Sequence, residues 1–367
     1  MKKNLYIIGT RGLPAKHGGF ETFAEKLSLY LVNKNWNVFV YCQKIKKSKK
    51  IDKWKKINLI NINVKNNNPL SSVIFDYKSI LHASKQKGIF LILGYNTAIF
   101  NFILKIKKKN SIINMDGIEW KRDKWSKIIK IWFYINEFFG MLFSNVAIAD
   151  NPHIKSYLFN KYHTKKIIMI PYGAENKIYD VNQVLKKYGL QKKKYGIIVA
   201  RPEPENSVYE IIRVFSKKKR NIKLVVLGSY NFKYNEFHRR IKNISSKEII
   251  FLGSIYEKKE ITSLRLNSLF YFHGHKVGGT NPALVEALAT KCPIIAYDNP
   301  YNRWVAKNAA IFFKNDTSLD KNIDNLISNK KLRKKLSYNS HRRFLQNFTW
   351  DKILKKYEYC LNKNYKI

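Results

Sequence analysis

The chain has 367 residues, of which 45% are apolar and 14% are aromatic. This length and composition predict two domains with real cores and exclude an intrinsically disordered chain. Seventy basic residues against 25 acidic residues give a net charge of +45, which suggests a polyanionic partner or phosphorylated substrates. Biased codon usage explains the charge equally well, because the lysines are spread along the whole chain.

The cysteines and the apolar segments indicate the cellular compartment in which we expect the protein. Cys42, Cys292 and Cys360 are far apart and odd in number, which favours a reducing compartment without disulfides. No signal segment is recognised, and the longest apolar stretch, 89–106, predicts a strand followed by a helix. We therefore expect a cytoplasmic protein that is at most peripheral to the membrane.

Short apolar runs alternate with helical patterns along the whole chain. The first series of predicted strands comprises 5–9, 37–42, 59–64, 89–94, 112–115 and 146–150, with helices at 20–31 and 124–143 among them. The second series comprises 196–200, 223–228, 249–252, 269–272, 294–297 and 310–313, and helices at 332–347 and 350–361 follow it. Nearly continuous apolar strands separated by helices are typical of parallel sheets that are covered on both faces.

The pattern predicts an α/β fold with two doubly wound, Rossmann-like domains facing across a cleft. Ligands are expected in this cleft, outside the carboxyl ends of the strands. The predicted domains are residues 1–175 and 190–345, and residues 346–367 are expected to form a C-terminal helix that crosses back to the first domain.

The segment 273–286 is the most informative stretch of the second domain. Gly278 and Gly279 follow a buried strand, and Thr280 and Asn281 are candidate caps for a helix whose first residue is a proline. The free N–H groups and the dipole of such a helix start favour an anion. Glu286 lies about one turn further, where it can accept hydrogen bonds from ribose hydroxyls. An ordinary, well-capped strand–helix turn is the alternative.

These motifs, in this order, resemble the retaining family 4 group of GT-B glycosyltransferases over nearly the whole chain. Gly18 and Gly19 take the place of the family's Gly-Gly turn, through which backbone amides approach the donor phosphates or sugar. A turn that only needs a positive φ is the alternative. The family's domain-join motif appears as 171–175, and its Gly-Arg pair as Ala200-Arg201.

The resemblance implies roles for several residues of the second domain. Arg201 would contact the donor phosphate, and Glu286 would hold the ribose as the second Glu of the family's E-x7-E element. The first Glu of that element is Gly278 here, and the phosphate-binding Lys of the family falls on Asn206. Glu205, just before it, is a candidate donor-binding residue. His275 is our candidate to bind sugar hydroxyls in place of the missing Glu, although an ordinary packed histidine fits the pattern too.

A narrower resemblance rests on 18–23, on 116–122 and on the Gly-Gly-Thr-Asn-Pro segment. Together they resemble the β-1,4-rhamnosyltransferases of capsule and cell-wall synthesis. This implies retaining transfer of L-rhamnose from dTDP-rhamnose to a lipid-diphosphate-linked saccharide, by front-face attack and without a metal or cofactor. A UDP- or GDP-hexose donor and a basic nucleic-acid-binding protein remain alternatives. A nicotinamide dehydrogenase is excluded because the glycines after the first strand lack the G-x-G-x-x-G pattern.

The segment after the predicted strand 112–115 offers candidates for the acceptor side. Asp116 is a candidate catalytic residue that contacts the acceptor or the donor sugar, or else it only caps a turn before a glycine. Glu119, Trp120, Arg122 and Trp125 are candidates for acceptor and membrane contacts, because aromatic and basic residues alternate here. Core packing is the alternative for each aromatic residue. An anionic membrane surface, rather than nucleic acid, is the expected polyanion.

Overall fold

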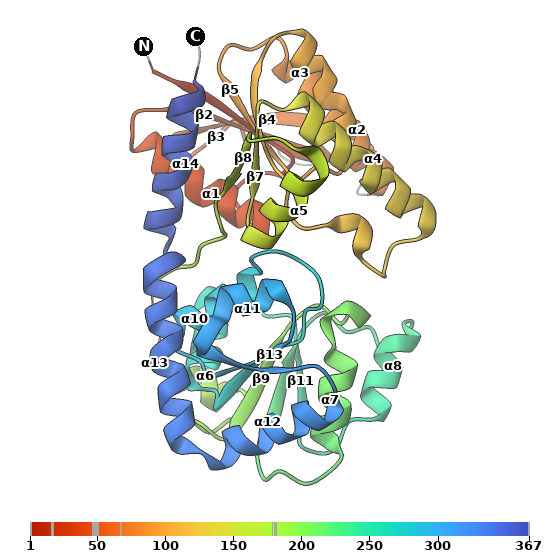
Figure 1. Cartoon of the computed structure of the whole chain (residues 1–367), viewed down its shortest axis with the longest axis vertical. Helices are drawn as coiled ribbons and strands as arrows, with labels where there is room; N and C mark the ends of the chain where they lie inside the picture. Colours follow the sequence, from red (N-terminus) through yellow and green to blue (C-terminus); the bar gives the residue numbers. More distant parts are fainter. Residues whose placement is uncertain are drawn as a thin grey trace. The chain divides into compact units, whose positions relative to one another are not determined.

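The computed structural model describes residues 2–15, 18–45, 51–66, 68–177, 179 and 182–365. The chain divides into two compact units, each built on a sheet flanked by helices (Figure 1). Unit 1 comprises residues 1–121, 125–171 and 350–367, and unit 2 comprises residues 122–124 and 172–349.

Unit 1 contains an eight-stranded sheet in the order β3-β4-β2-β1-β5-β6-β7-β8. Its strands are β1 Asn4–Ile8, β2 Asn37–Ile45, β3 Lys53–Trp54, β4 Ile57–Val64, β5 Ile89–Leu93, β6 Asn110–Asn114, β7 Val146–Ala149 and β8 Ile167–Met169. The pairing is parallel except between β3 and β4, which are antiparallel. The expectation of a parallel sheet is therefore confirmed apart from this edge.

Six α-helices belong to the described part of unit 1. They are α1 Gly19–Val32, α2 Pro69–Ala83, α3 Phe102–Ile106, α4 Lys127–Phe143, α5 Pro152–Tyr162 and α14 Trp350–Asn364, with short 3-10 turns η1 Ala98–Asn101 and η2 Glu119–Lys121. None of the helices that the structure describes is long and apolar enough to cross a membrane.

Unit 2 contains a six-stranded, fully parallel sheet in the order β11-β10-β9-β12-β13-β14. Its strands are β9 Tyr195–Val199, β10 Lys223–Leu227, β11 Ile249–Gly253, β12 Phe270–His273, β13 Ile294–Tyr297 and β14 Ala310–Phe313. Its helices are α6 Asn182–Lys187, α7 Val208–Ser216, α8 Glu236–Asn243, α9 Lys258–Asn267, α10 Pro282–Ala289, α11 Pro300–Ala306, α12 Asp316–Ser328 and α13 Lys330–Asn347, with 3-10 turns η3 Pro204–Asn206 and η4 Lys307–Ala309.

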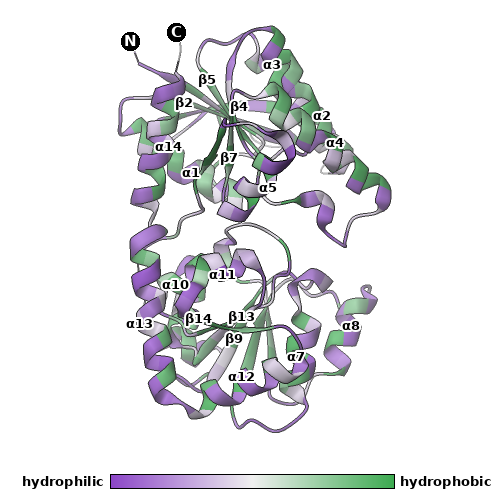
Figure 2. Cartoon of the chain, viewed as in Figure 1, coloured by the Kyte–Doolittle hydropathy of each residue, from purple (hydrophilic) through white to green (hydrophobic). Residues whose placement is uncertain are grey.

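Both faces of the second sheet are buried. Ile197 belongs to the core on one face and Ile198 to the core on the other, and Tyr271 and Phe272 are divided in the same way. Because successive side chains of a strand point to opposite faces, covering both faces requires an unbroken apolar run. The strands are accordingly hydrophobic along their length (Figure 2).

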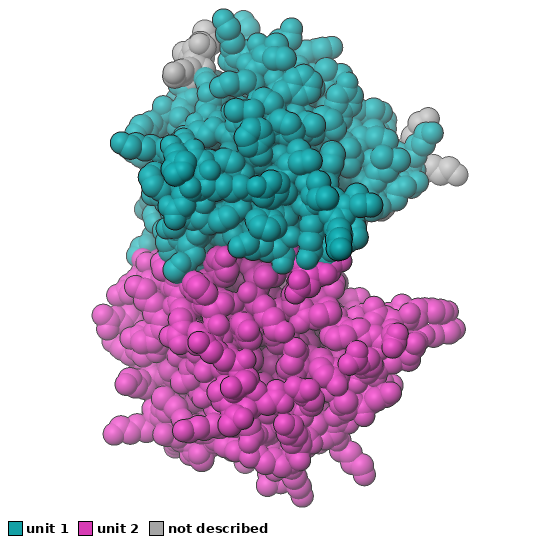
Figure 3. Space-filling model, turned by 45° about the vertical axis from the view of Figure 1, so that its right-hand side comes forward, with its two compact units in different colours: residues 1–121, 125–171, 350–367 teal, residues 122–124, 172–349 magenta. Residues whose placement is uncertain are grey.

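Figure 3 shows the two units in different colours. The last helix of the chain, α14, belongs to unit 1, whereas α13 belongs to unit 2. The Tyr357 ring of α14 lies 4.5 Å from the Phe23 ring of α1, and the Tyr357 hydroxyl accepts a hydrogen bond from Asn114 Nδ2 at 2.9 Å. Tyr30 donates to Glu358 Oε2 at 2.5 Å. The helix thus packs into the core of unit 1.

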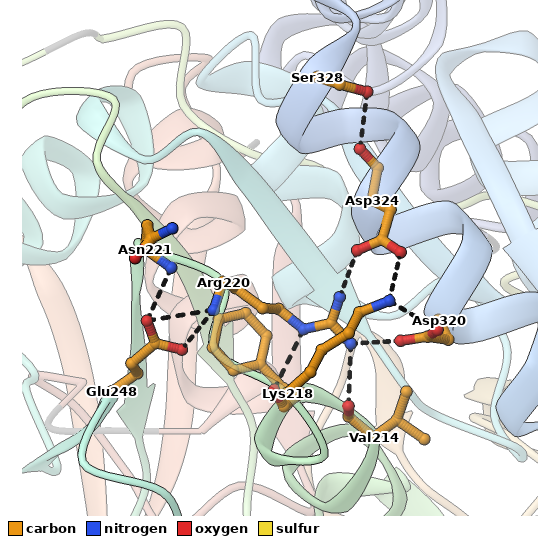
Figure 4. Close-up of polar contacts among 9 residues, drawn as sticks. Val214, Lys218, Arg220, Asn221, Glu248, Asp320, Asp324 and Ser328 are labelled. Atoms are coloured by element: carbon orange, nitrogen blue, oxygen red, sulfur yellow. Dashed lines mark hydrogen bonds and ion pairs between the residues drawn. The ribbon is translucent and has the colours of Figure 1, made fainter.

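A buried arginine joins α7 and α12 in unit 2 (Figure 4). The Arg220 side chain, 1% exposed, donates to the carbonyl oxygens of Phe215 at 3.1 Å and Val214 at 2.9 Å. It also forms ion pairs with Asp320 and, at 2.6 Å, with Asp324. Arg220 therefore satisfies the carbonyls at the end of α7 and links them to α12.

Candidate active site

The loops that follow β9 and β12 are in direct contact at the carboxyl ends of these paired strands. Lys276 N donates to the Glu205 carbonyl at 2.9 Å, and Ser207 Oγ donates to the Gly274 carbonyl at 2.8 Å. A Cβ on Gly274 would lie 2.3 Å from the Asn206 carbonyl oxygen, so only glycine fits there. This contact brings Glu205 close to the loop that carries His275.

The second loop leads into α10 as the sequence predicts. Asn281 is the N-cap, and its side chain accepts a hydrogen bond from Ala283 N at 2.9 Å, while Pro282 is the first helical residue. Gly278 has a φ of +129°, a conformation that favours glycine, and Thr280 is buried. Gly279 completes the turn. The helix start is therefore pre-formed by its own residues.

A buried arginine holds the carboxylate of Glu286. Arg265, on α9, donates from Nη1 to Glu286 Oε2 at 2.6 Å. The Arg265 side chain is 2% exposed, whereas that of Glu286 is 43% exposed. The carboxylate is thus fixed from the inside and remains accessible from the outside. The sequence does not mark Arg265 as part of the site, because an arginine in a mixed helix gives no local sign that it is buried.

His275 is held by its backbone and by its ring. Its carbonyl accepts from Asn299 Nδ2 and from Asn302 Nδ2, each at 2.9 Å. Its ring stacks on that of His273, with 4.3 Å between centroids and 9° between planes. The Nδ1 atom of His275 is buried and has no hydrogen-bond partner among the described residues. That atom therefore has a hydrogen-bonding capacity that the described residues leave unused.

The His275 ring is uncharged at physiological pH. Burial lowers the pKa of the imidazole to about 3, and the positive charges of Arg122 and Arg201 contribute in the same direction. A neutral ring can exchange hydrogen bonds with hydroxyl groups but cannot neutralise a phosphate.

Arg201 and Glu205 differ in exposure and in their contacts. The Arg201 side chain is exposed, and its carbonyl accepts from Asn206 Nδ2 at 2.9 Å. Glu205 is buried, and its Oε1 accepts from Arg122 Nη1 at 3.1 Å, in the short segment of residues 122–124 that belongs to unit 2. Its Oε2 has no hydrogen-bond partner among the described residues.

A carboxylate of the same chain lies close to the glycine turn before α1. Gly18 is the N-cap with a φ of 101°, and α1 begins at Gly19. A Cβ on Gly18 would lie 2.1 Å from Glu21 Oε2, and Glu21 Oε1 accepts from Arg11 N at 3.1 Å. Residues 16 and 17 of this motif lie outside the described residues. The Glu21 carboxylate therefore lies directly beside Gly18 at the start of α1.

The acceptor candidates follow β6 in unit 1. Asp116 is half-buried with a φ of +51°, and its N–H donates to Asn114 Oδ1 at 2.9 Å. Glu119 is buried, and its N–H donates to the Tyr95 hydroxyl at 2.7 Å. The left-handed turn at Asp116 is thus supported by a side chain of the preceding strand.

The two tryptophans of this segment make contacts inside unit 1. Trp120 is half-buried and donates from Nε1 to Glu137 Oε2 at 3.0 Å. The half-buried Trp125 ring lies 5.4 Å from the Phe133 ring.

In the part of the chain that the structure describes, no three or more His, Cys, Asp or Glu side chains form a group that could hold a metal ion.

Two family models match the chain. A domain of unknown function, DUF1972, matches residues 2–175, and the glycosyl transferases group 1 model matches residues 180–343. The chain is also 22% identical to an uncharacterized glycosyltransferase of Methanocaldococcus jannaschii, over 93% of this chain and 94% of the relative.

Two solved structures with similar folds cover 99% of this chain. Sucrose-phosphate synthase from Thermosynechococcus elongatus has a TM-score of 0.83 and 14% identity over 99% of its length. Anabaena HepE, solved in complex with UDP and glucose, has a TM-score of 0.75 and 12% identity over its whole length. With a group 1 glycosyltransferase domain in its second unit and the fold of these structures, the protein is a GT-B glycosyltransferase.

Proposed function

We propose that the chain transfers a sugar from a nucleotide-sugar donor with retention of configuration, and that unit 2 binds the donor. The observation that carries this proposal is the accessible Glu286 carboxylate, fixed by buried Arg265 just inside a helix capped by Asn281. A helix start suits a diphosphate, and a carboxylate about one turn away suits the ribose hydroxyls. Complexes of HepE with UDP and with UDP-glucose support a donor of this class.

The residues around the donor would have distinct roles. Arg201 would neutralise the leaving diphosphate, on which charge builds up in the transition state. Neutral His275 would bond to sugar hydroxyls through its unpaired Nδ1. Glu205 would accept a hydroxyl hydrogen bond at its unpaired Oε2. In the front-face mechanism that the family 4 resemblance implies, a donor phosphate oxygen takes the acceptor proton, so none of these side chains acts as a strong base.

Two donor classes compete. The rhamnosyltransferase-like motifs favour L-rhamnose from dTDP-rhamnose. The HepE complex with UDP-glucose favours a UDP-hexose as the second candidate. At position 278 a glycine replaces the Glu of family 4, which supports a sugar other than the usual hexoses.

For the acceptor we propose a lipid-diphosphate-linked saccharide, bound by unit 1 at the inner face of the cell membrane. Asp116 is the proposed contact to the acceptor hydroxyl, supported by its turn after β6. Glu119, Trp120 and Trp125 remain proposed acceptor contacts, although the indole nitrogen of Trp120 is bonded to Glu137. The enzyme would then act in the synthesis of surface polysaccharides.

The test is calorimetric binding of dTDP-rhamnose, UDP-glucose and GDP-mannose to the purified chain and to Glu286→Gln. One nucleotide sugar should bind clearly better than the others, and the variant should bind it more weakly. Glu260→Gln, which changes a carboxylate on α9 that pairs with Lys187 and not with Arg265, is the matched control. Failure of all three sugars to bind would refute the proposal. The anomeric configuration of the product, read by NMR, decides between retention and inversion.

A further inference from the structure

Three helices of unit 1 expose many large apolar side chains. The most exposed are Ile128 at 81%, Ile106 at 69% and Leu70 at 65%. We call the whole set the α2–α4 face; it comprises Leu70, Ile74, Tyr77 and Leu81 of α2, Phe102 and Ile106 of α3, and Ile128, Ile129, Ile131, Trp132, Tyr134, Ile135, Phe138 and Leu142 of α4. Figure 2 shows the hydrophobic colour along α2, α3 and α4. Monomeric soluble proteins rarely expose an apolar surface of this extent without a partner.

Helix α4 buries two polar side chains beside Phe133 and Met141, and it leaves many of its apolar side chains outside. Asn136 and Glu137 are buried, whereas Ile131, Ile135 and Phe138 are exposed. The exposed residues recur at spacings of three and four, which places them on one side of the helix. An amphipathic helix that packed only on its own unit would bury this side. The exposed stripe therefore has to be explained by a contact outside unit 1.

The buried polar residues fix this orientation of α4. Asn136 Oδ1 accepts from Ile99 N at 2.9 Å. Glu137 Oε1 accepts from the Tyr157 and Tyr162 hydroxyls at 2.9 Å and from Lys161 Nζ at 2.7 Å. Turning the helix to bury its apolar side would break these bonds and leave a buried carboxylate unpaired, which is costly.

The three helices form one continuous surface. The Tyr77 ring of α2 lies 5.2 Å from the Phe100 ring of η1, which leads directly into α3. The Phe102 ring of α3 lies 6.4 Å from the Phe143 ring of α4. The apolar side chains of the α2–α4 face therefore belong to adjoining helices and not to scattered sites.

The charge on these helices has one sign. Their two acidic residues are withdrawn from the surface, because Glu137 is buried and Asp76 is half-buried and accepts from Thr97 Oγ1 at 2.8 Å. The exposed charged residues on them and in the turn after α3 are Lys78, Lys105, Lys107, Lys108 and Lys127. Lysines beside an apolar surface complement an anionic bilayer, whereas two copies of this face would repel each other.

We propose that the α2–α4 face docks on an anionic lipid bilayer, with its apolar side chains at the boundary between headgroups and acyl chains and its lysines on the phosphates. Membrane docking deepens the proposed function. It rests on that function in one respect only, the lipid-linked acceptor. The surface is distinct from Trp120 and Trp125, which are partly buried in unit 1.

The test is co-sedimentation with vesicles of phosphatidylcholine and phosphatidylglycerol, compared with vesicles of phosphatidylcholine alone. The wild-type chain should bind the anionic vesicles, and added salt should weaken the binding. The triple variant Ile131→Gln, Ile135→Gln and Leu142→Gln changes only exposed side chains and should lower the partition coefficient at least about tenfold. Its matched control is Tyr234→Gln, Tyr256→Gln and Tyr338→Gln, exposed in unit 2, which should bind like wild type.

A second pair of variants tests the charge. Lys78→Gln, Lys105→Gln and Lys127→Gln should weaken binding to anionic vesicles only, whereas Lys331→Gln, Lys334→Gln and Lys335→Gln on α13 should have a clearly smaller effect. Equal binding of wild type and the apolar triple variant would overturn the proposal.

Self-association is tested on the same proteins by light scattering after gel filtration. The proposal would also be overturned if the wild-type chain were a dimer that did not bind vesicles and the apolar variant were a monomer. This outcome would show that the α2–α4 face is a dimer interface.

Calorimetric donor binding by each variant is measured in parallel. Loss of vesicle binding with intact donor binding, or the reverse, separates a failure of this inference from a failure of the proposed transferase activity.

Discussion

Arg265 and Glu286 form an ion pair between a buried arginine and a glutamate whose side chain remains 43% exposed. The arginine is anchored in α9 behind α10, so it approaches Glu286 from the interior. One oxygen of the carboxylate is thereby fixed before any ligand arrives. Such preorganisation reduces the side-chain entropy that a ligand would otherwise have to remove on binding.

The first prediction follows from this pair. Arg265→Met should weaken binding of the preferred nucleotide diphosphate by roughly 1–3 kcal/mol, because Glu286 loses the bond that orients it. Calorimetry on Arg265→Met, Glu286→Gln and the double variant gives a double-mutant cycle. We expect the double variant to bind about as well as Glu286→Gln alone. Strictly additive losses would contradict a positioning role for Arg265.

Arg201 is the subject of the second prediction. Its exposed guanidinium should act on the leaving diphosphate, so Arg201→Ala should lower kcat by roughly 10–100-fold while nucleoside affinity changes little. Steady-state kinetics with the preferred donor, together with calorimetric titration of the nucleoside, make the comparison. Arg240→Ala on α8 is a surface control in the same unit. A variant with unchanged kcat at saturating donor would exclude the role.

The third prediction concerns His275 and pH. Because burial depresses the pKa of this imidazole to about 3, the ring stays neutral between about pH 5 and 8. Donor affinity should therefore show no inflection near pH 6.5 that depends on His275. Calorimetry across this range, on wild type and on His275→Gln, is the measurement. The affinity of His275→Gln should be lower at every pH, and an inflection that disappears in this variant would contradict the prediction.

Much of the fold can be predicted from the sequence because buried parallel strands need unbroken apolar runs. The strands β3 and β8 were not predicted, since Lys53–Trp54 and Ile167–Met169 are too short to show a period. Several predicted strands end one residue early, as at Gly9 and Gly94, whose positive φ values end the extended backbone.

The candidate site contains local contacts, which the sequence predicts, and contacts between distant residues, which it does not. The Asn281 cap is local, so the sequence predicts it together with the helix start at Pro282. The bond from Arg265 to Glu286 joins two helices, and no local pattern contains it. The sequence does not predict the closeness of Glu21 to Gly18 for another reason. A glutamate in a first helical turn is ordinary, and only the structure places its carboxylate beside Gly18.

A fourth prediction concerns stability and pH. Burial raises the pKa of Asp76 from 3.8 to about 6, although a hydrogen bond from Thr97 acts in the opposite direction. Between these two values the native state binds more protons than the unfolded state. The free energy of unfolding therefore falls as pH rises through this window, and the loss is complete above about pH 6.

Asp76→Asn should remove this pH dependence of the free energy of unfolding. It should also stabilise unit 1 by roughly 2–3 kcal/mol at pH 7. Urea unfolding at pH 4.5 and pH 7, followed by fluorescence, is the measurement. Asp351→Asn, exposed on α14 in the same unit, should leave the dependence in place. An Asp76→Asn variant that is less stable than wild type at pH 7 would refute the assignment.

The fifth prediction tests the buried arginine of unit 2. Arg220→Met should destabilise this unit by about 3 kcal/mol, because two buried carbonyls at the end of α7 lose their donor. Lys218→Gln removes surface ion pairs to Asp320 and Asp324 and should cost less than about 1 kcal/mol. Urea unfolding of both variants is the measurement, and equal effects would contradict the prediction.

The position of α14 affects the order in which the units can fold during synthesis. Unit 1 contains the first 121 residues, but its core also needs Tyr357 and its buried neighbours on α14. The ribosome produces these residues after the whole of unit 2. Unit 2 can therefore reach its native state while unit 1 still exposes the surface of α1 that α14 covers, and this surface is where a chaperone would bind the growing chain.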